Sequence, residues 1–271
     1  MGVIELSFHI IFIIISFGFL AAFIDAVVGG GGLISIPALL AIGMPPSLAL
    51  GTNKLASAFG SLTSAIKFLK SGNVDKKIAF RLFPFVFIFA VGGASLATFL
   101  PSEVLKPLVI VILTLVLIYT IFKKEWGNVR TFSKLTISKA IAFISLLLLI
   151  GFYDGFLGGG TGSFMLFVLL MFGFDFLSAA GNAKVLNFAS NVGALTLFII
   201  LGQVNITYGL IMAVSMVIGS YTGAHFAIKK GVGYVKIVFI IVTILLILKN
   251  TFDYIMPVSY THLTLPTNRE V

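Results

Sequence analysis

Long apolar stretches limit the folds open to this sequence more than any other feature. Eight of them, each near the roughly 20 residues that a helix needs to cross a bilayer, cover residues 8–28, 47–69, 78–99, 104–122, 140–157, 176–200, 207–228 and 237–255. Because 59% of the 271 residues are hydrophobic and 10% are charged, too little polar surface is left to cover a water-soluble globule. We therefore expect an all-α, multi-pass integral membrane protein that binds no nucleic acid. Cysteine is absent, which excludes disulfides and thiolate metal sites.

Two shorter apolar segments, 33–42 and 163–172, each follow a glycine-rich turn. Ten helical residues rise only about 15 Å, half of the hydrocarbon thickness. We therefore expect half-helices that fold back against the preceding span as re-entrant hairpins.

Basic residues are concentrated in three junctions between the apolar stretches. Because Lys and Arg collect on the cytoplasmic side of membrane proteins, these junctions should be cytoplasmic and the N-terminus should lie outside. This sidedness holds only if the segment 140–172 enters the membrane and returns. The thirteen residues are Lys67, Lys70, Lys76, Lys77, Arg81, Lys123, Lys124, Arg130, Lys134, Lys139, Lys229, Lys230 and Lys236.

The sequence also repeats itself. Residues 25–32 (DAVVGGGG) match residues 154–161 (DGFLGGGT) at a shift of 129, and residues 49–54 (ALGTNK) match residues 179–184 (AAGNAK) at a shift of 130. Secondary transporters are commonly built from repeats of opposite topology.

We expect two inverted-topology repeats, 1–127 and 140–257, each a re-entrant hairpin plus three transmembrane helices. A basic cytoplasmic linker, 128–139, joins them. A duplication retained only for packing is the alternative. Residues 258–271 resemble a translated cloning adaptor and carry no functional argument.

Four ionisable residues, Asp25, Lys54, Asp154 and Lys184, lie inside apolar segments. Each costs about 2.5–3.5 kcal/mol in the middle of a membrane helix, so pairing or function must compensate. They could form two Asp–Lys ion pairs that tie the repeats together. They could also serve transport, with the lysines binding an anion and Asp25 or Asp154 carrying a coupled proton.

Hydrogen-bonding side chains share a helical face with each lysine, at i+3 and i+7 in both repeats. The glycine turns begin half-helices, whose first N–H groups carry partial positive charge and favour anions. We expect these groups to converge on a small anion such as a carboxylate, sulfonate, sulfite or sulfate, with no metal and no cofactor. The substrate-binding candidates are Gly29, Gly30, Gly31, Gly32, Thr52, Asn53, Lys54, Ser57, Ser61, Gly158, Gly159, Gly160, Thr161, Gly162, Asn182, Lys184, Asn187 and Asn191.

The function that this pattern favours is a secondary transporter that moves an anion by alternating access. An anion channel built from the same residues is a second reading. An intramembrane aspartyl protease is a third, suggested by Tyr153-Asp154 together with Asp25, but the GxGD motif of such enzymes is absent and buried lysines suit an anion better than a peptide bond.

The repeats carry a resemblance to a known family. Residues 25–62 (DAVVGGGGLISIPALLAIGMPPSLALGTNKLASAFGSL), residues 151–167 (GFYDGFLGGGTGSFMLF) and residues 182–198 (NAKVLNFASNVGALTLF) resemble the sulfite exporter TauE/SafE family, also called TSUP transporters, and look closest to its YfcA-like branch. The likeness covers roughly residues 8–255. It implies a permease of the bacterial inner membrane for sulfur-containing or organic anions.

Overall fold

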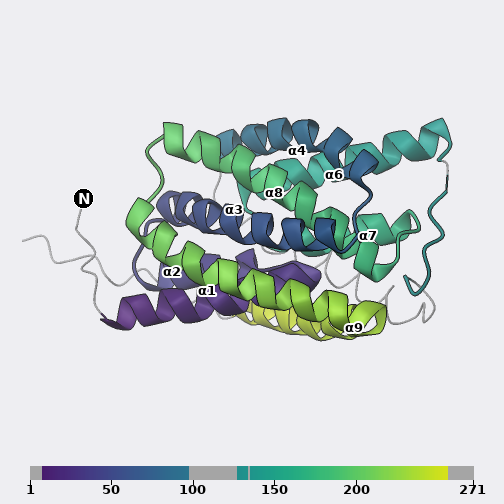
Figure 1. Ribbon diagram of the computed structural model, residues 1–271. Helices are drawn as coiled ribbons and strands as arrows, with labels where there is room; N and C mark the ends of the chain where they lie inside the picture. Colours follow the sequence, from purple (N-terminus) through teal and green to yellow (C-terminus); the bar gives the residue numbers. More distant parts are fainter. Residues whose placement is uncertain (1–7, 98–126, 134, 256–271) are drawn as a thin grey trace, which may run out of the picture.

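The computed structural model describes residues 8–97, 127–133 and 135–255, and every regular element among them is a helix (Figure 1). The expected span 104–122 lies outside these residues. The helices are α1 (Phe8–Val28), α2 (Gly32–Ala41), α3 (Pro46–Lys70), α4 (Lys76–Ala97), α6 (Ile137–Phe156), α7 (Thr161–Met171), α8 (Phe176–Ile200) and α9 (Ile206–Ile255).

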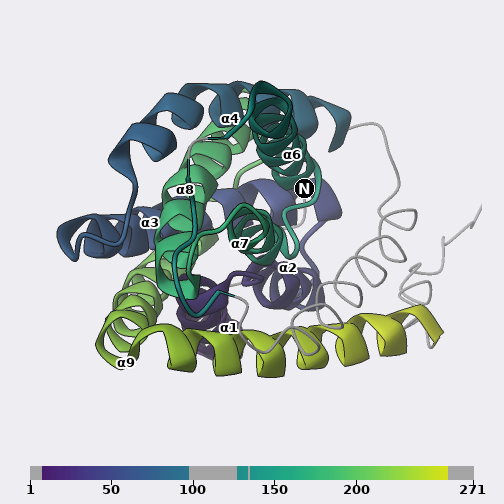
Figure 2. The same ribbon diagram turned by 90° about the vertical axis from the view of Figure 1, so that its right-hand side faces the viewer.

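The apolar stretches become helices close to their expected bounds. Helices α1 and α8 begin and end at the predicted residues, α3 is one residue longer at each end, and α6 begins three residues earlier and ends one residue earlier than predicted. Helix α9 is interrupted at Gly231, whose φ of 76° and ψ of −165° are not helical. Its two sections correspond to the predicted spans 207–228 and 237–255, and Figure 2 shows the second one lying along one side of the bundle.

The two short apolar segments are half-helices, as predicted. Helix α2 has 10 residues and α7 has 11. Each is followed by a glycine in the left-handed region, Gly43 with φ 85° and Gly173 with φ 96°, where a side chain would be strained. The chain can therefore turn sharply into the next long helix.

Five of the described helices are long and apolar enough to cross a membrane, namely α1, α4, α6, α8 and the part Ile206–Val242 of α9. Helix α3 has 25 residues but is less apolar, because it carries Lys54 and several serines on buried faces. Large apolar side chains such as Phe12, Ile88 and Leu149 remain about 60% exposed on the outside. A surface of this kind fits lipid rather than water, and the chain is a multi-pass membrane protein.

Helices α3 and α8 pack against each other at the centre, with α9 beside α3 and α4 beside α8 (Figures 1 and 2). The outer pairs are α1 with α9 and α4 with α6. Glycine allows close approach in both, because Gly223 lies against the carbonyl of Phe23 and Gly93 against the carbonyl of Phe152. Small residues at such crossings are typical of packed membrane helices.

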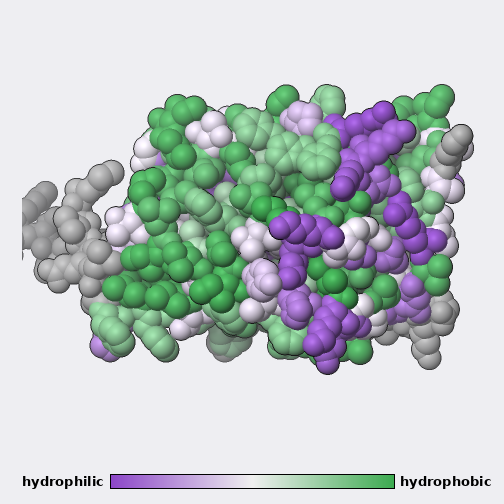
Figure 3. Space-filling model, in the orientation of Figure 1, coloured by the Kyte–Doolittle hydropathy of each residue, from purple (hydrophilic) through white to green (hydrophobic). Residues whose placement is uncertain are grey.

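The basic junctions meet at one end of the bundle. Arg130 in the segment before α6 forms an ion pair with Asp75 at 2.9 Å, and Lys236 donates to Asn128 at 3.4 Å. Hydrophilic side chains accordingly gather toward the right-hand part of the face in Figure 3. Lys123, Lys124 and Lys134 lie outside the described residues. The position of the described basic residues at one end agrees with the single basic side that the sequence predicts.

Candidate functional site

The four buried ionisable residues form two ion pairs. Lys54 Nζ lies 2.9 Å from Asp154 Oδ1, and Lys184 Nζ lies 2.8 Å from Asp25 Oδ2. The lysines come from α3 and α8, and the aspartates from the last turns of α1 and α6. Each pair therefore joins the part of the chain before the linker to the part after it.

Three of the four charged side chains are almost completely buried, and the fourth is partly exposed. The side chains of Lys54, Lys184 and Asp154 are 1–2% exposed, whereas that of Asp25 is 21% exposed. An isolated charge in such surroundings loses roughly several kcal/mol of hydration free energy, and a partner of opposite charge at hydrogen-bonding distance offsets this loss. The observed pairing thus explains how this chain holds four ionisable groups inside an apolar bundle.

The glycine turns bring both pairs together. Gly29 has φ 87° and sits directly on the backbone of Gly162 and Ser163, where no Cβ would fit. A Cβ at Gly32 would come within 2.6 Å of the carbonyl oxygen of Gly158. The N-terminal ends of α2 and α7 therefore meet, backbone against backbone.

The same turns face the lysines. A Cβ at Gly158 would lie 3.0 Å from Lys54 Nζ, and one at Gly162 would lie 3.2 Å from Lys184 Nζ. Glycine thus lets each ammonium group approach the main chain of the turn between α6 and α7.

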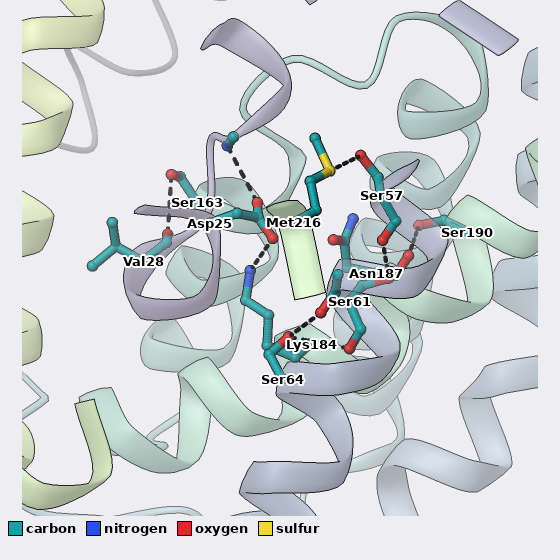
Figure 4. A network of polar contacts seen from close by, with 12 residues as sticks. Asp25, Val28, Ser57, Ser61, Ser64, Ser163, Lys184, Asn187, Ser190 and Met216 are labelled. Carbon is teal, nitrogen blue, oxygen red and sulfur yellow. Dashed lines mark hydrogen bonds and ion pairs between the residues drawn. The ribbon is translucent and has the colours of Figure 1, made fainter. Parts of the chain in front are cut away.

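Hydrogen bonding differs between the two carboxylates. Asp25 Oδ1 accepts from the backbone N–H of Gly31 at 3.2 Å, so the start of α2 already holds a negative group (Figure 4). Asp154 Oδ2 and the hydroxyl of Thr161 are buried and have no hydrogen-bond partner among the residues described. Lys54 additionally donates to Asn191 Oδ1 at 3.3 Å. The buried polar atoms without a partner among the described residues therefore belong to Asp154 and Thr161.

A small cavity lies between these groups. It offers about 20 Å³ to the centre of a water-sized sphere, which is room for roughly one water molecule. Its lining combines the two aspartates, Lys54 and polar side chains of α3, α7 and α8. The lining residues are Ala21, Ala22, Asp25, Gly31, Gly32, Asn53, Lys54, Ser57, Gly60, Ser61, Asp154, Gly158, Thr161, Gly162, Asn187, Asn191, Met216 and Ser220.

Most of the residues predicted to bind substrate line this cavity. Lys184 does not line the cavity, but its ammonium group donates a hydrogen bond to Asp25, which does line it. The glycines Gly29, Gly30, Gly159 and Gly160 shape the turns behind the cavity wall. Within these turns the hydroxyl of Tyr153 donates to the carbonyl of Gly159 at 2.6 Å.

Two predicted residues, Thr52 and Asn182, hold loops instead of lining the cavity. Thr52 Oγ1 accepts from the backbone N–H of Asn205 at 2.9 Å, and Asn182 Oδ1 accepts from that of Asp75 at 3.2 Å. Both side chains are fully buried. Each side chain therefore anchors a loop that belongs to the other half of the chain.

Some residues near the site are absent from the predicted set. Ser35 in α2 donates to Asn53 Oδ1 at 2.6 Å, and Ser57 lies 3.9 Å from the sulfur of Met216 (Figure 4). Ser35 could have been found as the one polar side chain of its half-helix. Met216 and Ser220 of α9 carried no such signal, because they lie in an apolar stretch and their repeat positions hold Val86 and Ala90.

The chain is a helical bundle that spans the membrane several times, and its buried charges gather at a cavity between two linked parts. This is the construction of a membrane transport protein. Comparison with known sequences gives the family. The family model described as "Sulfite exporter TauE/SafE" matches residues 14–250, and the chain belongs to this family.

Several curated relatives carry the name of a probable membrane transporter. The chain is 38% identical to probable membrane transporter protein ORF9 of a Sinorhizobium species, over 92% of this chain and 95% of that protein. It is 34% identical to a probable membrane transporter protein of Haemophilus influenzae, over 92% and 97%. It is also 34% identical to the probable membrane transporter protein YfcA of Escherichia coli, over 86% and 87%. No solved structure gives a significant match.

Proposed function

We propose that this chain is a secondary transporter that binds a small anion at the cavity between its two halves. The observation that carries the proposal is the pair of lysines, 1–2% exposed, whose counter-charges are two aspartates at that cavity. A transported anion can compete with a carboxylate for either ammonium group, whereas lipid cannot. The family name and the transporter relatives support the same class.

We further propose that the two halves are inverted-topology repeats. Contacts on one side of the linker have counterparts on the other at shifts of 129 or 130 residues. Lys54 with Asp154 corresponds to Lys184 with Asp25, Thr52 with Asn205 to Asn182 with Asp75, and Gly93 with Phe152 to Gly223 with Phe23. A two-fold relation between the halves produces such an exchange of partners. The loop 72–77 is basic and the corresponding loop 202–206 is uncharged, which favours opposite topology of the two halves.

The charge balance of the site bears on coupling. Two ammonium groups and two carboxylates sum to zero. An anion that binds to one lysine leaves a carboxylate unpaired in an apolar bundle, which is unfavourable unless a proton neutralises it. We propose that the anion moves together with a proton. Asp154 is the stronger candidate for that proton, since its Oδ2 lacks a hydrogen-bond partner among the described residues and its side chain is 2% exposed.

The anion we propose is sulfite, a sulfonate or another small sulfur-containing or organic anion. Lys54 lines the cavity together with Ser57, Ser61, Asn187 and Asn191, and these side chains offer several hydrogen-bond donors to a compact oxyanion. The cavity would have to widen to admit even sulfite, because it now has room for roughly one water molecule.

A cavity with room for roughly one water molecule favours a carrier over a channel, since a channel needs a continuous path for the ion. An aspartyl protease uses two carboxylates that share one proton. Here Asp25 and Asp154 each hold a separate lysine, which supports transport as the function.

Transport can be tested with purified protein in liposomes. Uptake of radiolabelled sulfite, sulfate, sulfonates and carboxylates is measured with and without an imposed pH gradient, for the wild type and for Lys54→Ala and Lys184→Ala. We expect saturable, gradient-dependent uptake that both variants lose, while Arg130→Gln, which alters an ion pair outside the cavity, retains it. Uptake that does not saturate would identify a channel, and full activity of both lysine variants would refute the site.

Topology has a separate test, because the chain contains no cysteine and single cysteines can be introduced cleanly. Asn73→Cys and Gln203→Cys lie in corresponding loops of the two halves. We propose a multi-pass protein of the bacterial plasma membrane with its N-terminus outside, so a membrane-impermeant maleimide should label Gln203→Cys in intact cells and Asn73→Cys only after permeabilisation. Labelling of both in intact cells would refute inverted repeats.

A further inference from the structure

A groove at the basic end of the bundle is separate from the cavity between the halves. It lies between the first turns of α4, the first turns of α6 and the segment before α6, and its volume is about 570 Å³. The residues around it are Asp75, Lys77, Ile78, Arg81, Leu82, Phe132, Ser133, Leu135, Ala140, Phe143 and Ile144. Its floor is apolar, whereas its rim carries charges.

The rim has a net positive charge. Both carboxylate oxygens of Asp75 already have partners, because Oδ2 pairs with Arg130 at 2.9 Å and Oδ1 accepts from the backbone N–H of Ile78 at 3.2 Å. Lys77 and Arg81 are exposed and have no ion-pair partner among the residues that the structure describes. They are four residues apart on α4, so they lie on one helical face. Two cations therefore border the same side of the groove.

The floor of the groove extends along the bundle axis. Helices α4 and α6 run in the same direction, and beyond the groove they close on each other, where Val86 meets Gly151 and the carbonyl of Ala90 meets Gly155. From the rim inward, the groove passes Leu82, Phe143 and Ile144. An occupant would thus have a negative group at the rim and an apolar body that continues toward the middle of the bilayer.

We propose that this groove binds an anionic glycerophospholipid, with the phosphate held by Lys77 and Arg81 and one acyl chain lying on the apolar floor beside Leu82, Phe143 and Ile144. Basic pockets between membrane helices on the cytoplasmic side are suited to such headgroups. Charge complementarity selects an anionic over a zwitterionic lipid, and the apolar floor selects a lipid over free phosphate. The proposal does not depend on what the protein transports.

Native mass spectrometry of the detergent-purified protein can test this binding. Phosphatidylglycerol and phosphatidylcholine with identical acyl chains are titrated against the wild type and against Lys77→Gln/Arg81→Gln. Each basic residue near a membrane surface is worth about a factor of 5 in binding, so the double variant should lose about 30-fold in affinity for phosphatidylglycerol. Affinity for phosphatidylcholine should not change.

The matched control is Lys229→Gln/Lys230→Gln, which removes two exposed charges away from the groove and should keep the preference. Ala140→Phe narrows the groove without changing its charge and should also weaken phosphatidylglycerol binding. Gel filtration verifies that each variant is folded. Equal binding of both lipids by the wild type, or equal losses in the variant and the control, would overturn the proposal. Displacement of the lipid by millimolar inorganic phosphate would do so as well, because it would identify a simple anion site.

Discussion

Removing one lysine from a buried ion pair should destabilise the protein by an amount set by the exposure of the aspartate left behind. Lys54→Met retains the volume of the side chain but leaves Asp154, 2% exposed, without its cation. Breaking a buried pair in this way costs about 3–5 kcal/mol, or roughly 6–20 °C in melting temperature for a chain of this size. Lys184→Met should cost about half as much, because Asp25 is 21% exposed and keeps the N–H of Gly31 as a partner.

The double variant Lys54→Met/Asp154→Leu separates the charge from the packing. With both partners replaced by apolar side chains, stability should return to within about 1 kcal/mol of the wild type, whereas transport should remain lost.

Heating followed by gel filtration of the fluorescently tagged protein in detergent measures these differences in stability. The reasoning would be refuted by a Lys54→Met variant as stable as the wild type. It would equally be refuted by a double variant no more stable than the single one, or by equal losses for the two lysines.

Three further changes have expected outcomes. Thr52→Val removes the acceptor for the backbone N–H of Asn205 and should lower stability by about 1–3 kcal/mol while leaving KM for the anion unchanged, so a raised KM in the liposome assay would contradict its role as a loop anchor. Gly29→Ala should prevent accumulation of folded protein, because its Cβ would overlap the backbone of Gly162 and Ser163. Gly43→Ala has nearly the same φ but lies in open space, so it should lower the free energy of unfolding by only about 1–2 kcal/mol. Equal yields of the two variants in gel filtration would contradict this. Arg130→Gln breaks a partly exposed ion pair and should change stability by less than about 1 kcal/mol, which a larger shift in melting temperature would disprove.

The sequence predicted the helices well because bilayer thickness fixes their length. Helices α1 and α8 match their predicted bounds, and both half-helices lie within two residues of theirs. Which helices pack against each other was harder to predict from the sequence. Gly219 and Gly223 of α9 lie against α1, but the sequence does not identify α1 as their partner, since lipid and a neighbouring helix are equally apolar surroundings.

The site was predicted where charge made the residues stand out. Asp25, Lys54, Asp154 and Lys184 were found because each is unfavourable at its depth, and the structure brings them together. The two Asp–Lys pairs between the repeats, one of the two alternatives that the sequence offered, are present in the structure. Charge balance alone does not select them, because pairs within one half would balance the same charges. Thr52 and Asn182 look like ligand-binding residues in the sequence, yet a buried loop amide satisfies each as well as a substrate would.

The unequal halves indicate how a transport cycle could proceed. Lys54 lines the cavity and its partner Asp154 is shielded, whereas Lys184 lies behind the wall and its partner Asp25 is more exposed. If the halves are related by inverted topology, exchanging their conformations produces a second state of similar energy, in which Lys184 lines the cavity and Asp154 becomes the exposed carboxylate. The same two ion pairs exist in both states, so the exchange breaks no buried pair permanently. An anion and a proton would need only to weaken one pair at a time, and each would find the vacated partner within the same small cavity.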